Sequence, residues 1–287
     1  MTLAATRLAD AYPTRIAGEP ELIDRTDPSV WGDDNTVGPI DPATLASHHT
    51  KGYSVHHDLL SDAEVAAFRD ELARLAAHDG VRDDERTVLG PTGEVSAIYE
   101  VHETSELVGE LVRDPRVLDR ARQILGSDVY VHQSRIDYLP GFHGKGSYWH
   151  SDFEVWHAED GMPAPRAVSM SIPLTGQQEL TGELMAMPGS HRTFVPAPRG
   201  SGGVPGQEHL TSLAAAYGID RFTDAEGSVL MLDANLMQGS ADNITPFPRT
   251  NIFVVFSSVE NQLVKPFAGG SPRPDFVANR DPSPLRR

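Results

Sequence analysis

The chain has 287 residues and no cysteine, and its 24 basic and 41 acidic residues give a formal net charge of −17. A chain this acidic is repelled by nucleic-acid phosphates and by anionic lipid surfaces, so we expect neither a nucleic acid nor a membrane as its partner. The cysteine count excludes a disulfide scaffold, a thiolate zinc site and a cysteine nucleophile, and together with the lack of a long apolar run it favours a cytoplasmic protein.

The first part of the chain predicts an irregular arm and then a helix. Residues 1–45 are rich in Pro, Asp, Gly and Thr and lack sustained periodicity, which indicates an arm lying over the domain rather than a separate module. A helix is expected over 61–79, because Ser61 and Glu64 have the spacing of a capping box and an apolar stripe follows them.

A second helical stretch is expected over 105–125, and short strands follow it. Asp114 and Pro115 restart this stretch as N-cap and first helical residue, and Gly126 ends it. The predicted strands are β-branched or apolar runs between Gly/Pro turns: Val129–Tyr138, Ala167–Leu174, Glu183–Met187, Gly227–Leu232 and Asn251–Ser258.

This order of elements predicts the fold class. Helices that come first and strands that come later favour an antiparallel β core with helices on its outside over a parallel βαβ array. We therefore predict a mainly β protein with flanking helices and a single domain over 46–267. Inside that domain 195–210 has the composition of a loop or lid, and beyond it 268–287 predicts a tail without regular structure.

One short stretch, residues 148–157, carries the clearest chemical signal. His150 and Asp152 are two residues apart, so on an extended strand both side chains point to the same face. They would supply two of the three ligands of a 2-His-1-carboxylate site, which leaves open positions on non-haem Fe(II). The motif alone equally fits a structural His–Asp hydrogen bond, and without further context that interpretation is favoured.

Two later segments have the layout that completes such a site. A third ligand is expected on a later strand, followed by a basic residue that grips a distal carboxylate, and segments 233–240 and 246–251 have this layout. Arg249 stands at the head of an apolar strand. A guanidinium inside a barrel needs an anionic partner, which a bound dicarboxylate provides.

Six segments between about residue 94 and the tail are long and distinctive: ILGSDVYVHQSRIDYLPGF, YWHSDFEVWHAEDGMP, RAVSMSIPLT, MPGSHRTF, GSADNITPFPRTNIFVVFSSVEN and PRPDFVANRD. They resemble the ectoine hydroxylase group of the phytanoyl-CoA dioxygenase superfamily. The resemblance implies a double-stranded β-helix (jelly-roll or cupin-like) core, a small-molecule substrate, Fe(II), and 2-oxoglutarate and O₂ as cosubstrates. It implies a reaction that couples decarboxylation of 2-oxoglutarate to hydroxylation of an unactivated C–H bond, and it leaves a homodimer open as the assembly.

By position, the resemblance also implies the residues that hold iron and cosubstrate. His150 and Asp152 match catalytic iron ligands. Arg249 and Ser240 match contacts of 2-oxoglutarate, and Ser169 is a further one.

The resemblance implies substrate-pocket residues as well. Gln133, Trp156 and Phe253 match them, and Arg280 is a candidate for the substrate carboxylate. A small zwitterion needs a hydrogen-bonding amide and aromatic walls that face a delocalised cation. For Trp156 and Phe253 the alternative is ordinary core packing.

Three features depart from the family pattern. Gln238 stands where the family has the distal iron-binding His, and its amide oxygen is a poorer donor to Fe(II) than imidazole. Val155 stands where the family typically has Thr beside the pocket Trp, and the lid over 195–226 is shorter than usual.

The sequence therefore supports one function and leaves two alternatives open. The favoured function is an Fe(II)/2-oxoglutarate-dependent hydroxylase that converts ectoine to 5-hydroxyectoine. Val155 and the short lid favour instead a hydroxylase of a free cyclic or basic amino acid such as pipecolate or proline. Gln238, placed as a third metal ligand, favours a catalytically impaired binding protein.

Overall fold

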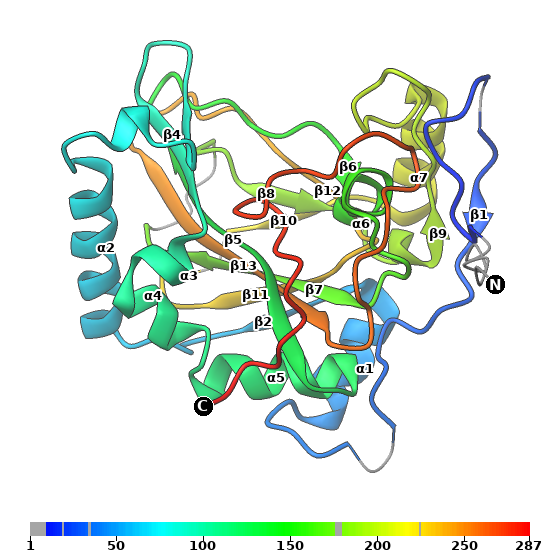
Figure 1. The fold of residues 1–287 in the computed structure, drawn as a ribbon, viewed down its shortest axis with the longest axis horizontal. Coiled ribbons are helices and arrows are strands. Elements are labelled where there is room, and N and C mark those ends of the chain that lie inside the picture. The colour runs from blue at the N-terminus through cyan, green and yellow to red at the C-terminus, as the bar shows by residue number, and fades with distance from the viewer. Residues whose placement is uncertain (1–9, 19, 34–35, 176–179, 224) are drawn as a thin grey trace, which may run out of the picture.

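The centre of the protein is a seven-stranded antiparallel sheet of order β2-β11-β7-β13-β5-β4-β3 in a computed structural model (Figure 1). The structure describes residues 10–18, 20–33, 36–175, 180–223 and 225–287. In sheet order the strands are β2 (Tyr53–His56), β11 (Val229–Asp233), β7 (Ala167–Pro173), β13 (Arg249–Ser258), β5 (Val129–Leu139), β4 (Val95–Tyr99) and β3 (Thr87–Leu89).

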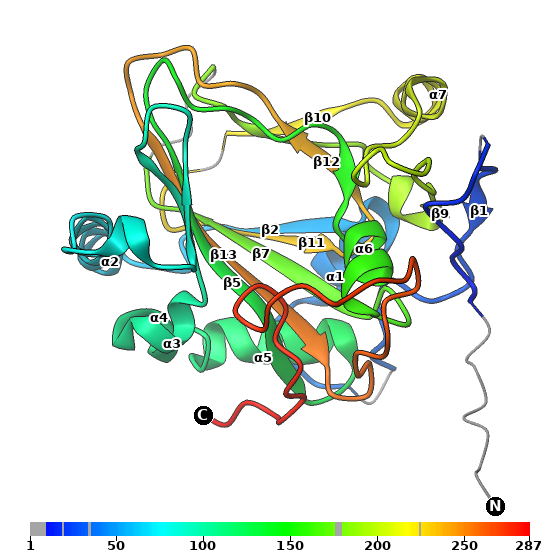
Figure 2. The ribbon, with the colours of Figure 1, turned by 45° about the horizontal axis from the view of Figure 1, so that its top comes forward.

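A four-stranded sheet of order β10-β8-β12-β6 lies over one face of the large sheet (Figure 2). Its strands are β10 (Asp220–Phe222), β8 (Leu184–Ala186), β12 (Met237–Ser240) and β6 (His150–Ser151). All the pairings in both sheets are antiparallel. Two antiparallel sheets stacked in this way form a double-stranded β-helix, or jelly roll, so the predicted fold class is confirmed.

Helices cover the opposite face of the large sheet (Figure 2). They are α2 (Asp62–Ala76), α3 (Val101–Thr104), α4 (Glu106–Leu111) and α5 (Pro115–Leu125). Buried side chains from both layers form one core cluster, which includes Phe68, Leu72, Leu118, Ile124, Ile136, Met170 and Ile252. Burial of these apolar side chains holds the helices against the outer face of the sheet. The inner face of the sheet faces the site.

The helix boundaries follow the local signals in the sequence. The Ser61 side chain accepts from the backbone of Glu64 and the Glu64 side chain accepts from the backbone of Ser61, so both halves of the predicted capping box are present. The stretch predicted over 105–125 consists of two helices, because Asp114 caps α5 anew. Gly126 ends α5 with a φ of 61°, a conformation that favours glycine.

The predicted strands correspond to β5, β7, β8, β11 and β13, whereas several shorter elements had no clear pattern. The unpredicted elements include α1 (Pro42–Lys51), α3, β2, β3, β4, β6, β10, β12, and the 3₁₀ turns η1 (Val81–Asp83) and η3 (Ser190–Arg192). The loop predicted over 195–210 is wrong at its end, because α7 (Gln207–Tyr217) begins there. Leu210 and Leu213 bury one face of α7, and this tertiary contact stabilises a helix that the Gly/Pro-rich flank hides.

The two terminal segments lie against the jelly roll. β1 (Ile23–Asp24) pairs with β9 (Thr193–Phe194). The tail contains no helix or strand in 268–287, yet the amide of Asn279 donates to the His132 carbonyl of β5 at 2.8 Å. The arm therefore has a defined place beside β9, and the tail has one beside β5, which carries site residues.

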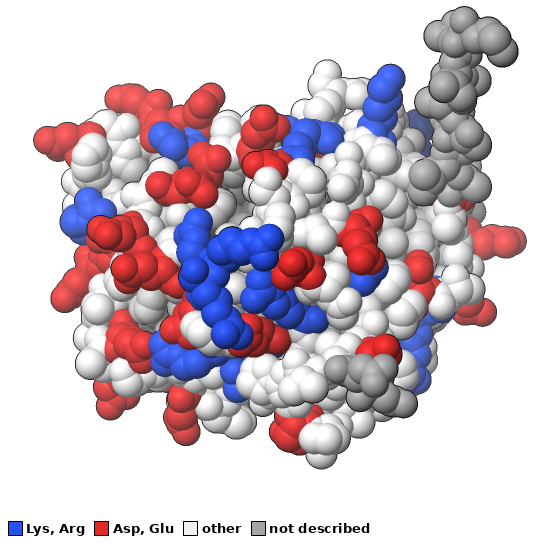
Figure 3. Space-filling view, turned by 60° about the horizontal axis from the view of Figure 1, so that its bottom comes forward, with Lys and Arg blue, Asp and Glu red and all other residues white. Residues whose placement is uncertain are grey.

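Acidic side chains lie on several parts of the face that Figure 3 shows. On the face in Figure 3, acidic side chains surround a central group of basic ones, so the surplus forms no continuous acidic patch there. Among the helices in the described ranges, none has the length and hydropathy to cross a membrane.

Candidate active site

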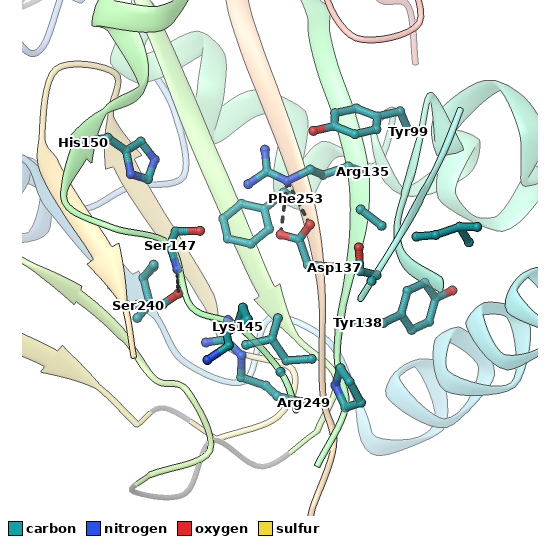
Figure 4. Close-up of a pocket in the computed structure, with 18 of the residues that line it drawn as sticks. Tyr99, Arg135, Asp137, Tyr138, Lys145, Ser147, His150, Ser240, Arg249 and Phe253 are labelled. Atoms are coloured by element: carbon teal, nitrogen blue, oxygen red, sulfur yellow. Dashed lines mark hydrogen bonds and ion pairs between the residues drawn. The ribbon is translucent and has the colours of Figure 1, made fainter. Parts of the chain in front are cut away.

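A cavity of about 530 Å³ lies between the two sheets, and most of the predicted site residues line it. Its walls come from β5, β12, β13, the short helix α6 (Asp152–Val155) and the π turn η2 (Trp156–Asp160) that follows. The predicted residues in its lining are Gln133, His150, Asp152, Val155, Trp156, Gln238, Ser240, Arg249 and Phe253. Figure 4 shows several of them facing one another across the space.

His150 and Asp152 converge, although the predicted reason is wrong. Strand β6 ends at Ser151 and Asp152 is the first residue of α6, so the two residues do not share a strand face. Their side chains nevertheless approach to 3.4 Å between His150 Nε2 and Asp152 Oδ1. The backbone turns into the helix directly after the strand, and this turn brings the carboxylate beside the imidazole.

Hydrogen bonds orient both groups. His150 Nδ1 donates to the Tyr148 carbonyl at 2.7 Å, so in the neutral imidazole Nε2 is the nitrogen that carries the lone pair. Asp152 Oδ2 accepts from Ser169 Oγ at 3.0 Å and from Gln238 Nε2 at 2.7 Å. Ser169 therefore contacts Asp152 and is not part of the cavity lining.

Sheet register brings Gln238 to the same point. β12 pairs with β6 so that Gln238 lies opposite His150. In the described part of the chain no three His, Asp or Glu side chains gather where they could hold a metal. The donor set at this point is one imidazole, one carboxylate and one amide.

The pair favours a charged Asp152 and a protonated His150, so a metal that binds His150 Nε2 displaces a proton. Burial opposes the charged form of each group, but Asp152 and His150 stabilise one another's charge more strongly. The pKa of His150 is therefore raised and the pKa of Asp152 is lowered from their ordinary values. Asp152 remains a carboxylate, the form in which it binds a cation.

Arg249 begins β13 and points into the same cavity (Figure 4). It is only 3% exposed, and its Nε and Nη1 have no hydrogen-bond partner among the residues that the structure describes. Burial lowers the pKa of Arg249, although the carboxylates of Asp137 and Glu183 act against this. Ser240 also lines this end of the cavity, and its Oγ accepts from the Ser147 amide at 2.9 Å.

The predicted substrate residues form the other walls. Gln133 is held on both sides, because its Nε2 donates to the Val277 carbonyl at 2.7 Å and its Oε1 accepts from Arg135 at 2.7 Å. The Arg135 guanidinium lies 4.5 Å above the Phe253 ring, so a protein cation already covers one face of that ring. Trp156 lines the cavity and packs edge-on against His132 with the ring centroids 5.2 Å apart.

The structure does not bring Arg280 to the cavity. Its guanidinium donates to the backbone carbonyls of Asp160 and Val264, and the residue is not in the lining. Arg273, from the same tail, lines the cavity instead and forms two hydrogen bonds with the Asp160 carboxylate, at 2.7 and 2.5 Å. Nothing in the tail's sequence pattern separates these two arginines.

Sequence reasoning missed two further charged residues on β5. Arg135 and Asp137 line the cavity and form an ion pair at 3.1 Å, which Figure 4 shows. A signal was present, because they follow Gln133 at intervals of two on one strand. The cavity therefore carries a row of polar side chains along β5 opposite His150.

The chain is similar to known proteins over nearly its whole length. The family described as phytanoyl-CoA dioxygenase (PhyH) matches residues 48–251. A Nocardia farcinica protein called ectoine dioxygenase is 51% identical over 290 residues, which cover 96% of this chain and 95% of that protein.

Solved structures give the same relation. The crystal structure of EctD from S. alaskensis with 2-oxoglutarate and 5-hydroxyectoine superposes with a TM-score of 0.90 at 43% identity, covering 94% of this chain and 95% of that one. The structure of the same protein with bound Fe also has a TM-score of 0.90 at 43% identity, with 96% and 97% covered.

Proposed function

Since the chain belongs to the phytanoyl-CoA dioxygenase family, we propose that it is an Fe(II)- and 2-oxoglutarate-dependent dioxygenase that hydroxylates ectoine to 5-hydroxyectoine. One observation carries the proposal: the His150–Asp152 pair and the buried guanidinium of Arg249, with two nitrogens lacking hydrogen-bond partners among the described residues, open into one cavity. The His150–Asp152 pair suits a divalent cation, and the Arg249 guanidinium suits a carboxylate.

Iron fits the donor set at His150 and Asp152. Nε2 of the deprotonated His150 and the ionised Asp152 are typical Fe(II) ligands, and they lie close enough to share one ion. Gln238 supplies an amide. A rotation by half a turn about the bond that carries this amide group exchanges its nitrogen and oxygen. We assign its oxygen as the third, weaker ligand. Iron held by these three residues would supply the oxygen chemistry of the reaction.

The cosubstrate fits the opposite end of the cavity. A buried guanidinium with unpaired N–H groups is costly, and a carboxylate that accepts from them removes this cost. We propose that Arg249 and Ser240 hold the distal carboxylate of 2-oxoglutarate. Because Ser169 donates to Asp152 and does not line the cavity, we assign it the role of orienting the Asp152 carboxylate in place of its predicted contact with the cosubstrate.

The substrate occupies the remaining volume in this proposal. A cavity of about 530 Å³ lies within the range of small-molecule sites. Trp156 and the uncovered face of Phe253 form walls for a delocalised cation, beside Val155, and the clamped amide of Gln133 offers a fixed polar contact. For the substrate carboxylate we propose Arg273 in place of Arg280.

The chain's own residues position the reactants and exclude water. Arg249 orients 2-oxoglutarate, and the aromatic walls present the substrate carbon to the metal side of the cavity. The tail closes the site, because the Val277 carbonyl accepts from Gln133 and Asn279 bonds to β5. Excluding water strengthens the ionic contacts inside and protects the oxidising step from side reactions.

A binding protein is the second candidate, and one observation favours it. Gln238 Nε2 donates to Asp152 at 2.7 Å. In this orientation the amide presents its nitrogen to the carboxylate and does not offer its oxygen to iron. An anaerobic calorimetric titration with Fe(II) in the presence of 2-oxoglutarate separates the two. Micromolar binding of Fe(II) supports the enzyme; binding of 2-oxoglutarate without any binding of Fe(II) supports the second candidate.

A hydroxylase of pipecolate or proline is the alternative that Val155 favours. The same assay with the three compounds as competing substrates decides between them. For location and assembly we propose a cytoplasmic homodimer, which cell fractionation and sedimentation test directly.

A further inference from the structure

The segment 152–160 carries both the reactive side of the cavity and two buried acids. Asp152, Val155 and Trp156 line the cavity. Glu154 is 1% exposed and Asp160 is fully buried. Buried carboxylates destabilise a fold unless they are paired, so their partners show what holds this segment in place.

The partners of Glu154 come from the N-terminal arm. Its Oε1 accepts from Thr14 Oγ1 at 2.6 Å and from Arg15 Nε at 2.7 Å, and its Oε2 accepts from Arg15 Nη2 at 3.0 Å. Arg15 also reaches Glu159 at 3.1 Å. One guanidinium of the arm, that of Arg15, therefore forms ion pairs with two residues on the outer side of the segment, Glu154 and Glu159.

The geometry of Arg15 indicates a site built for this contact. Its φ of 56° lies in the left-handed region, which is unfavourable for a residue with a side chain. Its amide donates to the Ala197 carbonyl at 2.9 Å, which holds the backbone in that conformation. A side chain at Gly203 would come within 2.8 Å of Glu154, so the loop after β9 closes tightly over the pair.

Other arm residues extend the contact. The buried ring of Tyr12 packs edge-on against Phe153 with centroids 5.1 Å apart. His157 Nε2 lies 2.9 Å from Asp10 Oδ1. Along the outer side of the segment the arm thus meets Phe153, Glu154 and His157, none of which lines the cavity.

The other end of the segment is held from the opposite end of the chain. Asp160 accepts two hydrogen bonds from Arg273 of the tail, and His132 Nε2 lies 3.3 Å from its Oδ2. The segment is therefore fixed between an arginine of the N-terminal arm and an arginine of the tail. In Figures 1 and 2 it lies beside the red tail, toward the blue arm.

We propose that Arg15 and Glu154 form a positioning pair, through which the N-terminal arm sets the orientation of Asp152 and Trp156 in the cavity. The expected effect on turnover rests on the proposed function. The expected effect on hydrogen exchange in segment 152–160 rests on these contacts alone. Arg15 does not line the cavity. It acts on the segment through its ion pair with Glu154.

The test compares Arg15→Ala, the conservative Arg15→Lys, and Arg82→Ala, a matched control at an exposed arginine outside the cavity lining. In Arg15→Ala we expect amide hydrogen exchange in 152–160 to be at least about tenfold faster, with the helices on the far face of the large sheet unchanged. The KM for ectoine should rise at least about fivefold, because Trp156 and Asp152 lose their fixed placement. The affinity of the metal-free protein for 2-oxoglutarate, which depends on Arg249 of β13, should stay within about twofold.

Arg15→Lys should recover most of the exchange protection, and Arg82→Ala should match the parent. Unchanged exchange in 152–160, or acceleration throughout the protein, would overturn the positioning role. Should Arg15→Ala fail to fold, Glu154→Gln keeps the shape but removes the charge and one of the two acceptor oxygens for Arg15, and it should show the same local acceleration to a smaller degree. If the parent does not turn over ectoine, the proposed function fails while the exchange experiment still decides this inference.

Discussion

Replacing Arg249 by Lys separates binding of the cosubstrate from stability of the fold. In the free protein two of the guanidinium nitrogens make no hydrogen bond within the described residues, so Lys removes little that stabilises the fold. With 2-oxoglutarate bound, Arg offers two parallel N–H donors to one carboxylate and Lys offers a single point charge. The loss is one charge-assisted hydrogen bond, about 1.5–3 kcal/mol, or roughly 10- to 150-fold in affinity.

Thermal stability with and without 2-oxoglutarate measures this loss. At a ligand concentration of about 100 times the parent's Kd, the parent gains about 2.7 kcal/mol of unfolding free energy. A variant that binds roughly 30-fold more weakly gains only about 0.9 kcal/mol at the same concentration. Without ligand the two proteins should unfold within about 0.5 kcal/mol of each other, and Arg82→Lys, at an exposed position, serves as the control.

Two results would refute the reasoning. An equal gain in stability with ligand would show that Arg249 does not hold 2-oxoglutarate. A large loss of stability in the ligand-free variant would show that the guanidinium has a structural partner in the folded protein.

The remaining predictions concern iron, pH and the substrate carboxylate. Gln238→His should raise Fe(II) affinity at least about tenfold, because imidazole is the better donor; equal affinities in anaerobic titration would show that the amide oxygen already suffices. Burial lowers the pKa of His48 from 6.5 to about 4. As the pH drops, the unfolded chain therefore binds this proton before the folded protein does. The free energy of unfolding falls between about pH 6.5 and pH 4, by about 3 kcal/mol in total. Urea unfolding should show this loss in the parent and less of it in His48→Gln, and parallel pH profiles would contradict it. Arg273→Lys should raise the KM for ectoine roughly tenfold while Arg280→Lys leaves it unchanged, and the reverse order in steady-state kinetics would restore the sequence-based assignment.

The sequence predicted best what depends on neighbouring residues. The capping box at Ser61, the N-cap at Asp114 and the glycine at 126 are local signals, and each marks a helix end in the structure. The apolar runs predicted four of the seven strands of the large sheet, β5, β7, β11 and β13, for the same reason. Short elements such as β6 and β12, with two and four residues, are defined by pairing with distant strands, which no local pattern contains.

The site shows the same limit. The spacing of His150 and Asp152 predicted a shared strand face, whereas a turn into helix α6 brings them together. The arginine partners of Glu154 and Asp160 lie more than one hundred positions away, so the sequence could not connect Arg15 or Arg273 with the site. Long-range packing decides which of many polar residues face the cavity.

Coupled product formation tests the central claim most directly. The parent protein is incubated with Fe(II), 2-oxoglutarate, O₂ and ectoine, and succinate and 5-hydroxyectoine are measured together. Our account predicts that both products form in equal amounts and that succinate falls sharply when ectoine is left out. Absence of 5-hydroxyectoine from both the parent and Gln238→His, under conditions in which both bind Fe(II) and 2-oxoglutarate, would contradict it.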